Sequence, residues 1–391
     1  MEISSLSLSA EAKSSLALAG ITKLNPPQHA AIEAGLLDGR NIVVASPTAS
    51  GKTLIAELAF LKCILERRKK ALYIVPLRAL ASEKYDDFKR YESLGVRTAI
   101  SVGDLDSSDS WLGSYDLIIV TSEKLDSLLR HEPAWIHEIG LVIADEVHLL
   151  NDDSRGPTLE VVLTRLRELR PQVLALSATI ANAEELASWL SAVLVRSDYR
   201  PVTLHQGVYD GTAVRFEDST RDFDIDSDAP DIAITGETLR RGKQALVFAS
   251  SRRNAESIAE KAAATVEKHL STDEKGKLSA LSEQILAVPS RATPQCERLA
   301  ACVIRGVAFH HAGLASGQRK LVEDAFRANI IKAIAATPTL AAGLNLPAYR
   351  VLIRDLRRYH PAHGSIYIPV LEYHQMAGRA GRPRYDKEGE A

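Results

Sequence analysis

The sequence predicts an α/β protein made of two similar-sized domains, each with a mostly parallel sheet flanked by helices. Short, continuous apolar runs alternate with amphipathic stretches, a pattern typical of strands that are buried on both faces. The first run, residues 42–45, is followed by a Gly-Lys-Thr turn and an amphipathic stretch from Leu54 to Leu65, which is the order strand, tight loop, helix. The series stops near Val195, and a second series of the same kind begins at Ala245.

The expected elements follow in order along the chain. In the first domain we expect helices at about 3–20 and 29–37, and strands at 42–45, 71–75, 98–102, 117–120, 141–144 and 173–176. Residues 196–243 are polar and acid-rich, so we expect a linker with a surface hairpin. In the second domain we expect strands at 245–249, 307–309, 333–336 and 351–353, and helices at about 253–270, 276–288, 294–305 and 317–328. We place the domains at residues 1–205 and 206–391.

Composition limits the function classes. The length of 391 residues and the hydrophobic content of 46% are ordinary for a globular chain of two or three domains. No apolar run approaches the roughly 18 residues that a membrane span needs, and the N-terminus does not resemble a secretory signal. The three cysteines lack zinc-site spacing, so we expect reduced, structural thiols in a cytoplasmic protein. A net charge of −2 argues against a compact sequence-specific DNA-binding module, but not against a protein that contacts a strand through a few loops.

The stretch from Ser46 to Thr53 matches the end of a phosphate-binding loop. In such loops backbone N–H groups surround phosphate oxygens, the Lys reaches the β- and γ-phosphates, and the Thr hydroxyl binds Mg²⁺. Lys52 and Thr53 take these positions at the start of a helix, whose positive dipole end adds to the attraction. Ser46 stands where the motif has Gly, and Ser is unfavourable if that position needs a positive φ. The stretch alone leaves a chance match at a strand–helix junction open.

Two adjacent acids follow the strand at 141–144. A nucleotide-hydrolysing site needs an acid at a strand end to hold Mg²⁺ opposite the phosphate-loop Thr, and Asp145 suits that role. Glu146 is placed to orient and deprotonate the attacking water. The alternative is a pair of acids that only caps a helix.

An arginine pair lies near the C-terminus, in the stretch from Gln375 to Arg382. Arg379 and Arg382 are three residues apart and can project from one helix face into a cleft. A guanidinium directed at the γ-phosphate stabilises the charge of the transition state. The alternative is a basic, solvated helix, but the two glycines in the stretch lower helix stability and a solvated helix gives no reason for them.

Together these stretches resemble the superfamily-2 DExH helicases of the Ski-like branch, and within it the archaeal HelQ/Hjm-type DNA helicases. The matching motifs run in the family order across nearly the whole chain: Pro26-Pro27-Gln28, the phosphate loop, Pro76 to Leu80, Thr121 to Lys124, Asp145 to His148, Ser177 to Thr179, Phe248 to Arg252, His310 to Leu314, Thr337 to Asn345, and Gln375 to Arg382. Members of this family often lack the first Gly of the phosphate loop, so Ser46 agrees with the resemblance.

The resemblance implies two tandem RecA-like P-loop NTPase domains with ATP and Mg²⁺ between them. It assigns ATP binding to Gln28 (adenine), Thr48, Ala49, Ser50, Gly51, Lys52, Thr53, Gly343 and Asn345. Catalysis is assigned to Lys52, Asp145, Glu146, His148, Gln375, Arg379 and Arg382, with Mg²⁺ on Thr53 and Asp145. Ser177 and Thr179 are expected to couple the ATP state to the grip on the strand. Gln28 could instead be a helix-start residue, and Ser177 and Thr179 a helix cap.

The resemblance also implies a nucleic-acid path over both domains. The expected contacts are Arg78, Thr121, Ser122, Lys124, Ser251, Arg252, His310, His311, Thr337, Thr339 and Tyr359, mostly to phosphates and without sequence readout. His310 and His311 could instead pack in the core or bind a metal. A hairpin within about 351–373, from the apolar runs at 351–355 and 365–370, is expected to carry Tyr359, His360 and His363 near its tip and to separate the duplex. The alternative is an ordinary edge hairpin.

The implied function is an ATP-dependent 3′→5′ DNA helicase that acts on single-stranded or forked DNA in fork repair or restart. The alternatives are a Ski-like RNA helicase and an ATP-binding clamp that does not unwind. We expect a monomer without membrane contact, with replication or repair proteins as further partners. The family normally continues with a winged-helix domain and a helical ratchet domain, so the chain is expected to be a piece of a longer protein that binds ATP and strand but translocates weakly.

Overall fold

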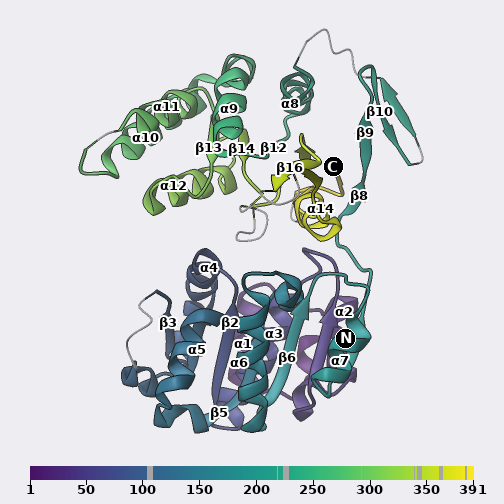
Figure 1. Cartoon of the computed structure of the whole chain (residues 1–391), viewed down its shortest axis with the longest axis vertical. Coiled ribbons are helices and arrows are strands. Elements are labelled where there is room, and N and C mark those ends of the chain that lie inside the picture. The colour runs from purple at the N-terminus through teal and green to yellow at the C-terminus, as the bar shows by residue number, and fades with distance from the viewer. Residues whose placement is uncertain are drawn as a thin grey trace. The chain divides into compact units, whose positions relative to one another are not determined.

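The computed structural model describes residues 1–103, 109–217, 219–222, 229–291, 293–338, 340, 346–360, 364–383 and 385–391 (Figure 1). They form two compact units, Met1–Arg200 and Pro201–Ala391. Each unit is an α/β domain with a parallel main sheet flanked by helices, so the predicted fold class is confirmed. None of the described helices is long and apolar enough to cross a membrane.

The first unit contains a seven-stranded parallel sheet in the order β3-β4-β2-β5-β6-β1-β7. The strands are β1 (Ile42–Ala45), β2 (Lys70–Val75), β3 (Thr98–Ser101), β4 (Leu117–Thr121), β5 (Ile139–Ala144), β6 (Gln172–Ser177) and β7 (Val193–Arg196). The helices are α1 (Ala10–Leu18), α2 (Pro26–Glu33), α3 (Lys52–Leu61), α4 (Arg78–Phe88), α5 (Ser122–His131), α6 (Gly156–Glu168) and α7 (Ala183–Trp189).

Alternate residues of each strand face two separate cores. Ile42 and Val44 of β1 pack with residues of α1, α3 and α4, whereas Val43 packs with residues of α5, α6 and α7. The sheet is therefore covered on both faces, which explains why its strands appear in the sequence as unbroken apolar runs (Figure 1). At the end of α1, Leu16 is fully buried whereas Leu18 is 91% exposed.

The second unit contains a six-stranded parallel sheet in the order β13-β14-β12-β15-β18-β8. Its strands are β8 (Thr203–His205), β12 (Ala245–Phe248), β13 (Val307–His310), β14 (Ala333–Ala336), β15 (Arg350–Ile353) and β18 (Glu388–Glu390). The described helices are α8 (Pro230–Arg240), α9 (Arg252–Glu267), α10 (Thr272–Ala287), α11 (Pro294–Val303), α12 (Ser316–Arg327) and α14 (Val370–Ala377).

The segment predicted as a linker contains more structure than expected. β9 (Gly207–Tyr209), β10 (Ala213–Phe216) and β11 (Thr220–Asp222) form a small antiparallel sheet, and α8 buries Ile234 and Leu239. β8 pairs with β18, so it belongs to the second unit, which begins at Pro201 and not after residue 205. Short strands with few apolar residues carry little periodic signal, which is why the sequence did not predict them.

The hairpin near residue 360 is smaller than predicted. β16 (Arg357–His360) pairs with β17 (Gly364–Tyr367) in a separate two-stranded sheet. The apolar run at 351–353 is not part of it, because β15 pairs with β12 inside the main sheet. Tyr359 lies on β16 with its side chain 79% exposed, whereas His363 and the side chain of His360 are outside the described part of the chain.

Candidate functional site

The phosphate loop joins β1 to α3 in the first unit. Its positive φ angles lie at Ala49 (66°) and Gly51 (93°), and Ser46 is not among the positive-φ residues. A serine at position 46 is therefore compatible with the loop. Gly51 has a second reason to be glycine, because a Cβ there would lie 2.4 Å from Gln28 Nε2.

Hydrogen bonds hold the loop closed on itself. The hydroxyls of Ser46 and Ser50 are 2.8 Å apart, and both residues are fully buried. The ammonium of Lys52 donates to the carbonyls of Ser46 (2.7 Å) and Pro47 (2.9 Å). Lys52 can thus exchange two carbonyl partners for phosphate oxygens when a nucleotide enters.

Gln28 ties α2 to the phosphate loop. Its Oε1 accepts from the backbone N–H of Asn25 (2.7 Å), as part of the capping box of α2, and its Nε2 donates to the Gly51 carbonyl (3.0 Å). The side chain is 3% exposed. The helix-start role left open by the sequence is therefore present.

Asp145 and Glu146 follow β5, at the same sheet edge as the phosphate loop after β1 and Ser177 at the end of β6. The carboxylate of Asp145 accepts from the Tyr73 hydroxyl (2.8 Å) and from the backbone N–H of Glu146 (3.0 Å). Burial, and next the charge of Glu146, raise the pKa of Asp145. A buried carboxylate whose charge is costly, together with the Thr53 hydroxyl, is the oxygen donor set that suits Mg²⁺.

Lys84 is a site residue that the sequence analysis missed. It lies on α4, is 6% exposed, and donates from Nζ to Thr53 Oγ1 (3.0 Å). Close by, Glu57 of α3 accepts from the Tyr91 hydroxyl (2.8 Å) and pairs with Arg90. No short motif predicts this contact, because it joins two helices that are distant in the sequence.

His148 links the acid pair to the stretch at Ser177–Thr179. Its Nδ1 accepts from the backbone N–H of Ala178 (3.2 Å), and its Nε2 lies 3.5 Å from Glu146 Oε2. Burial lowers the pKa of His148, which keeps the ring neutral and able to accept. Ser177 is fully buried and its carbonyl accepts from the backbone N–H of Ser46 (3.2 Å), while Thr179 is exposed.

The arginine pair of the second unit does not share a helix face, which corrects the sequence-based expectation. α14 contains Gln375 but ends at Ala377, so Arg379 and Arg382 follow the helix. Arg379 is 8% exposed. Arg382 donates to Asp386 (2.8 Å) and to Gln244 (2.8 Å). Gly378, the C-cap, still has helical angles (φ −58°, ψ −18°), and the chain takes a positive φ only at Gly381 (84°), between the two arginines.

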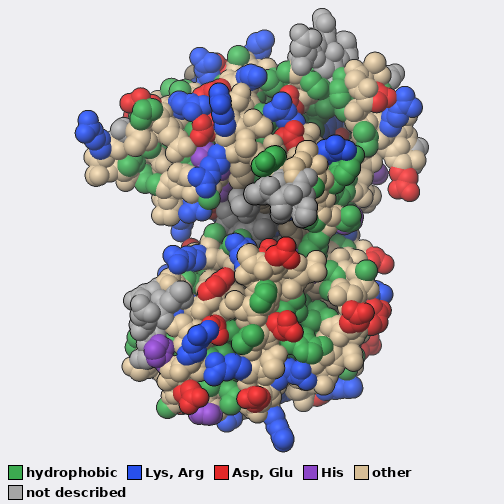
Figure 2. Space-filling model, in the orientation of Figure 1, with side chains coloured by type: hydrophobic (Ala, Val, Ile, Leu, Met, Phe, Trp, Pro, Cys, Tyr) green, Lys and Arg blue, Asp and Glu red, His purple; other side chains and the backbone are tan. Residues whose placement is uncertain are grey.

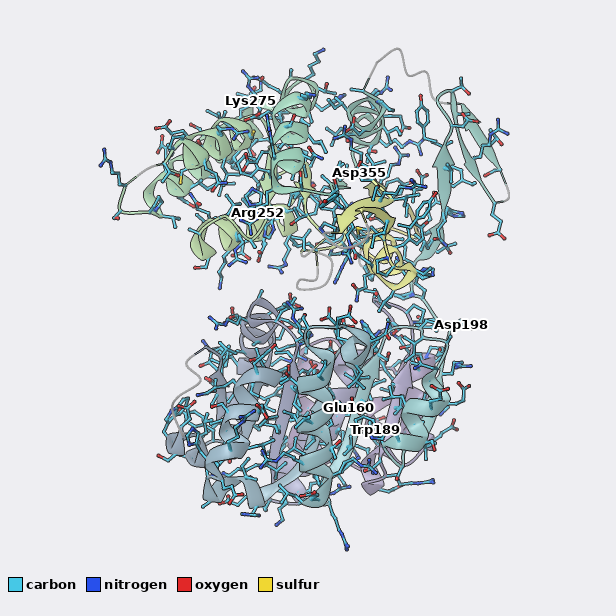
Figure 3. All side chains as sticks on the ribbon, in the orientation of Figure 1. Glu160, Trp189, Asp198, Arg252, Lys275 and Asp355 are labelled. Carbon is cyan, nitrogen blue, oxygen red and sulfur yellow. The ribbon has the colours of Figure 1, made fainter. Side chains whose placement is uncertain are left out.

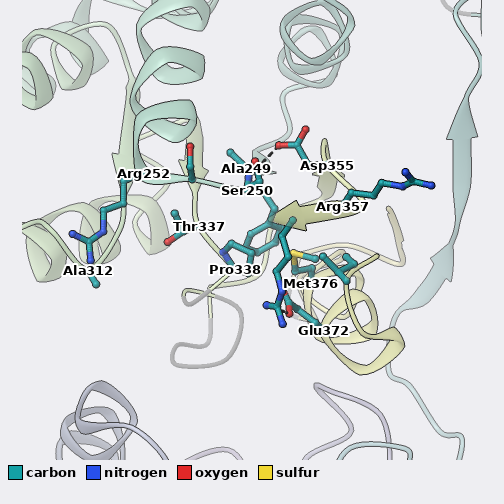
Figure 4. Close-up of a pocket in the computed structure, with 14 residues that line it drawn as sticks. Ala249, Ser250, Arg252, Ala312, Thr337, Pro338, Asp355, Arg357, Glu372 and Met376 are labelled. Carbon is teal, nitrogen blue, oxygen red and sulfur yellow. Dashed lines mark hydrogen bonds and ion pairs between the residues drawn. The ribbon is translucent and has the colours of Figure 1, made fainter. Parts of the chain in front are cut away.

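A pocket of about 320 Å³ in the second unit brings predicted strand contacts together (Figure 4). Ser251, Arg252 and Thr337 line it, from separate segments of the chain. The base of the hairpin adds Asp355, which accepts from the backbone N–H of Ser250 (3.1 Å), and the cations Arg357 and Arg358. Arg252 is exposed at the first residue of α9 (Figure 3). Exposed groups such as Arg252 and the Ser251 hydroxyl suit a phosphate backbone, whereas Thr337 is only 9% exposed.

Several other predicted strand contacts are buried and paired, so their side chains do not suit that role. Lys124 is 1% exposed, and its Nζ lies 3.1 Å from Asp109 Oδ2. Thr121 caps α5 by accepting from the backbone N–H of Lys124 (3.4 Å), and Ser122 is 3% exposed. The order of motif residues in the sequence does not show whether a residue contacts the ligand or stabilises the loop that approaches the ligand.

The two neighbouring histidines are also buried. The Nε2 atom of His310 lies 2.8 Å from Glu323, and that of His311 lies 3.1 Å from Glu256. Both rings are therefore buried, as expected from the alternative that these histidines pack in the core. Arg78, in contrast, is exposed at the start of α4, where its guanidinium lies near Gly103. Thr339, Gly343 and Asn345 fall outside the described residues.

The chain is similar to known helicases over nearly its whole length. Residues 25–186 match the DEAD/DEAH box helicase family, and residues 282–384 match the helicase conserved C-terminal domain. Three relatives carry the name ATP-dependent DNA helicase Hel308: those of Methanocella arvoryzae (52% identical), Caldivirga maquilingensis (50%) and Pyrococcus abyssi (48%). The matches cover 100%, 95% and 100% of this chain but only 53%, 50% and 53% of the relatives, so the chain spans about half their length.

Proposed function

The chain belongs to the superfamily-2 helicases, and we propose that it is the ATP-driven motor part of a DNA helicase that moves 3′→5′ on single-stranded DNA. The observation that carries the proposal is the set of groups at one sheet edge of the first unit. The phosphate loop, the acid pair and the Ser177–Thr179 stretch follow β1, β5 and β6, and His148 connects the last two. Ligands of open parallel sheets bind at this edge.

We infer the following division of labour in the first unit. Lys52 exchanges its bonds to the loop carbonyls for bonds to phosphate oxygens, and Gln28, whose amide also donates to the Gly51 carbonyl, contacts the adenine. Thr53 and Asp145 hold Mg²⁺, which when bound neutralises phosphate charge. Glu146 accepts a proton from the attacking water, and the neutral ring of His148 holds the Glu146 segment against Ala178.

For the second unit we propose that Arg379 and Arg382 stabilise the charge that develops on the phosphate, with Gln375 beside them. The bonds of Arg382 to Asp386 and Gln244 mean that its guanidinium has to be released, or shared, for this role. Gly343 and Asn345 keep their assignment to the nucleotide as a proposal.

The DNA strand is proposed to contact residues of both units, all of them exposed except Thr337, which is 9% exposed and lines the pocket. Arg78, Ser251, Arg252 and Thr337 are proposed to touch phosphates, and Tyr359 is proposed to stack at the hairpin. Figure 2 shows acidic and basic side chains intermixed on the visible face. The attraction for the DNA phosphates is therefore proposed to come from individual cations at the contact residues. Unwinding of forked DNA during repair or restart is proposed from the similarity to Hel308. An RNA substrate is the second candidate, since contacts to phosphates do not select the sugar.

Strand displacement tests the proposal. A 3′-tailed DNA fork should be unwound with ATP, and a 5′-tailed fork and an RNA fork of the same sequence should not. Unwinding of the RNA fork alone would reverse the choice of substrate, and DNA binding without any unwinding would favour a clamp.

Glu146→Gln separates chemistry from binding. We expect DNA-stimulated ATP hydrolysis to fall by a factor of about 10² or more, because the proton acceptor is lost, while ATP binding persists. Glu160→Gln is the matched control, since Glu160 is exposed on α6 (Figure 3). Unchanged hydrolysis in Glu146→Gln would contradict the assigned mechanism.

A further inference from the structure

Lys84 places a buried positive charge behind the phosphate loop. It lies on α4, one helical turn before Phe88, whose ring packs against Phe60 at 5.0 Å and Tyr73 at 5.4 Å between centroids. This packing fixes the face of α4 that carries Lys84 against α3 and β2. The side chain is 6% exposed, and its ammonium donates to Thr53 Oγ1 at 3.0 Å. Burial of an ammonium is costly unless nearby groups compensate its charge.

Two buried carboxylates compensate it. Glu57 is one helical turn after Thr53 on α3 and is 4% exposed, and Asp145 is 9% exposed. Burial raises the pKa of both carboxyls, and the charge of Lys84 opposes that rise in each case. Glu57 has further partners in Arg90 and Tyr91. Asp145 has the Tyr73 hydroxyl, so the cations near it are Lys84 and Lys52.

The ammonium of Lys84 therefore lies beside the Thr53 hydroxyl, one of the oxygens proposed to hold the metal. A lysine ammonium is a compact point charge on a flexible stem, so it can leave such a position without a change in the helix. We propose that Lys84 is a built-in counter-cation of the metal site, which donates a hydrogen bond to Thr53, offsets the charge of Asp145 and competes with Mg²⁺ for both residues. This inference rests on the proposed nucleotide site.

Competition has a measurable consequence for nucleotide affinity. With Lys84 present, a metal-free nucleotide finds a cation near its phosphates, whereas a metal-bound nucleotide has to displace that cation. Without the charge, metal-free binding should weaken and metal-bound binding should tighten. A purely structural role for Lys84, as a partner of Glu57, predicts no change in the dependence on metal.

The test measures the Kd of a fluorescent ADP analogue for the whole chain, in excess Mg²⁺ and in EDTA. Lys84→Met keeps the apolar stem and removes the charge, and we expect it to raise the ratio of Kd in EDTA to Kd in Mg²⁺ about tenfold or more. Lys84→Gln keeps a donor for Thr53 but no charge, and it should behave like Lys84→Met. Lys89→Met is the matched control, because Lys89 is exposed and lies over the Tyr85 ring at 4.6 Å.

An unchanged ratio in a folded Lys84→Met chain would overturn the inference. Equal weakening in both buffers would also overturn it, since Lys84 would then bind phosphate directly. Thermal unfolding of each variant checks that the first unit remains folded. If the wild-type chain binds the analogue in neither buffer, as expected for Lys52→Ala, the proposed nucleotide site itself is wrong. Binding by wild type with an unchanged ratio in the variant rejects only the role of Lys84.

Discussion

Two acids in each unit differ in the direction in which the pKa is shifted. In the first unit, burial raises the pKa of Asp145 and of Glu57, so their charged forms are costly. In the second unit burial also acts on Asp386 and Glu256, but hydrogen bonds and nearby cations outweigh it and lower the pKa of both. Asp145 thus keeps an under-compensated charge at the sheet edge where a metal and a phosphate would bind, whereas Asp386 and Glu256 are paired with cations inside the second unit.

Arginines account for much of the pairing in the second unit. Arg350, on β15, is 3% exposed, donates to Thr238 (2.7 Å) and to Glu390 (2.8 Å), and also pairs with Glu237. These bonds join α8, β15 and β18. Buried ion pairs with their hydrogen bonds made connect the elements of the scaffold, whereas buried acids with too few partners suit a ligand site.

The largest effect is expected from breaking this arginine cluster. Arg350→Met should cost the second unit about 3–5 kcal/mol in free energy of unfolding, because Glu237 and Glu390 lose a buried partner. Urea unfolding followed by circular dichroism measures the loss. Arg354→Met is the control: its side chain is 45% exposed, it lies 3.7 Å from Asp231, and its removal should cost below about 1 kcal/mol. Equal costs for the two variants would remove the contrast between the units.

Replacing a buried aspartate by asparagine is expected to change the free energy of unfolding by an intermediate amount, with opposite signs in the two units. Asp386 accepts from Lys243 (2.6 Å) and Arg382 (2.8 Å), so Asp386→Asn should destabilise the second unit by about 2 kcal/mol. Asp145→Asn should stabilise the first unit by roughly 1 kcal/mol at pH 7, because it removes a charge that burial disfavours. The gain should shrink as the pH falls through the raised pKa of Asp145, since the folded wild type is then protonated.

The chain itself offers a way to assign these changes to a unit. Its three tryptophans, Trp111, Trp135 and Trp189, all lie in the first unit, so their fluorescence follows that unit while circular dichroism follows both. A fluorescence midpoint that falls in Asp145→Asn would contradict the contrast.

The smallest effect is expected from the pH dependence of His148. Burial lowers its pKa, the charge of Glu146 opposes this and that of Lys52 adds to it. The unfolded chain therefore binds a proton near pH 6.5 that the folded chain does not, so stability is complete above this pH and falls as the pH drops below it, by at most about 1.4 kcal/mol per pH unit. His148→Gln should flatten the tryptophan-detected curve between about pH 6.5 and 5. His137→Gln, at an exposed site, should not, and equal slopes would contradict the assignment.

Much of the fold and part of the site could be predicted from the sequence. The strands at 42–45 and 333–336 appear at the expected residues, because unbroken apolar runs are specific to strands buried on both faces. β8 and α8 were missed, since a three-residue strand gives little periodic signal and the buried face of α8 contains Thr235, Gly236 and Thr238 besides Ile234 and Leu239. The arginine pair was expected on a helix face, but α14 ends at Ala377 and the chain takes a positive φ at Gly381 (84°), between the two arginines.

Residue type and local spacing are enough to predict most strands and helices, the phosphate loop, the acid pair and the similarity to superfamily-2 helicases. The partners of the buried polar residues, in contrast, follow from the packing of elements that are distant in the sequence. Lys124 and Lys84 are both lysines on helices, and the sequence does not distinguish them. In the structure Lys124 pairs with Asp109, whereas Lys84 donates to Thr53. Such contacts join residues from separate elements, and only the packing of helices on the sheet brings those elements together.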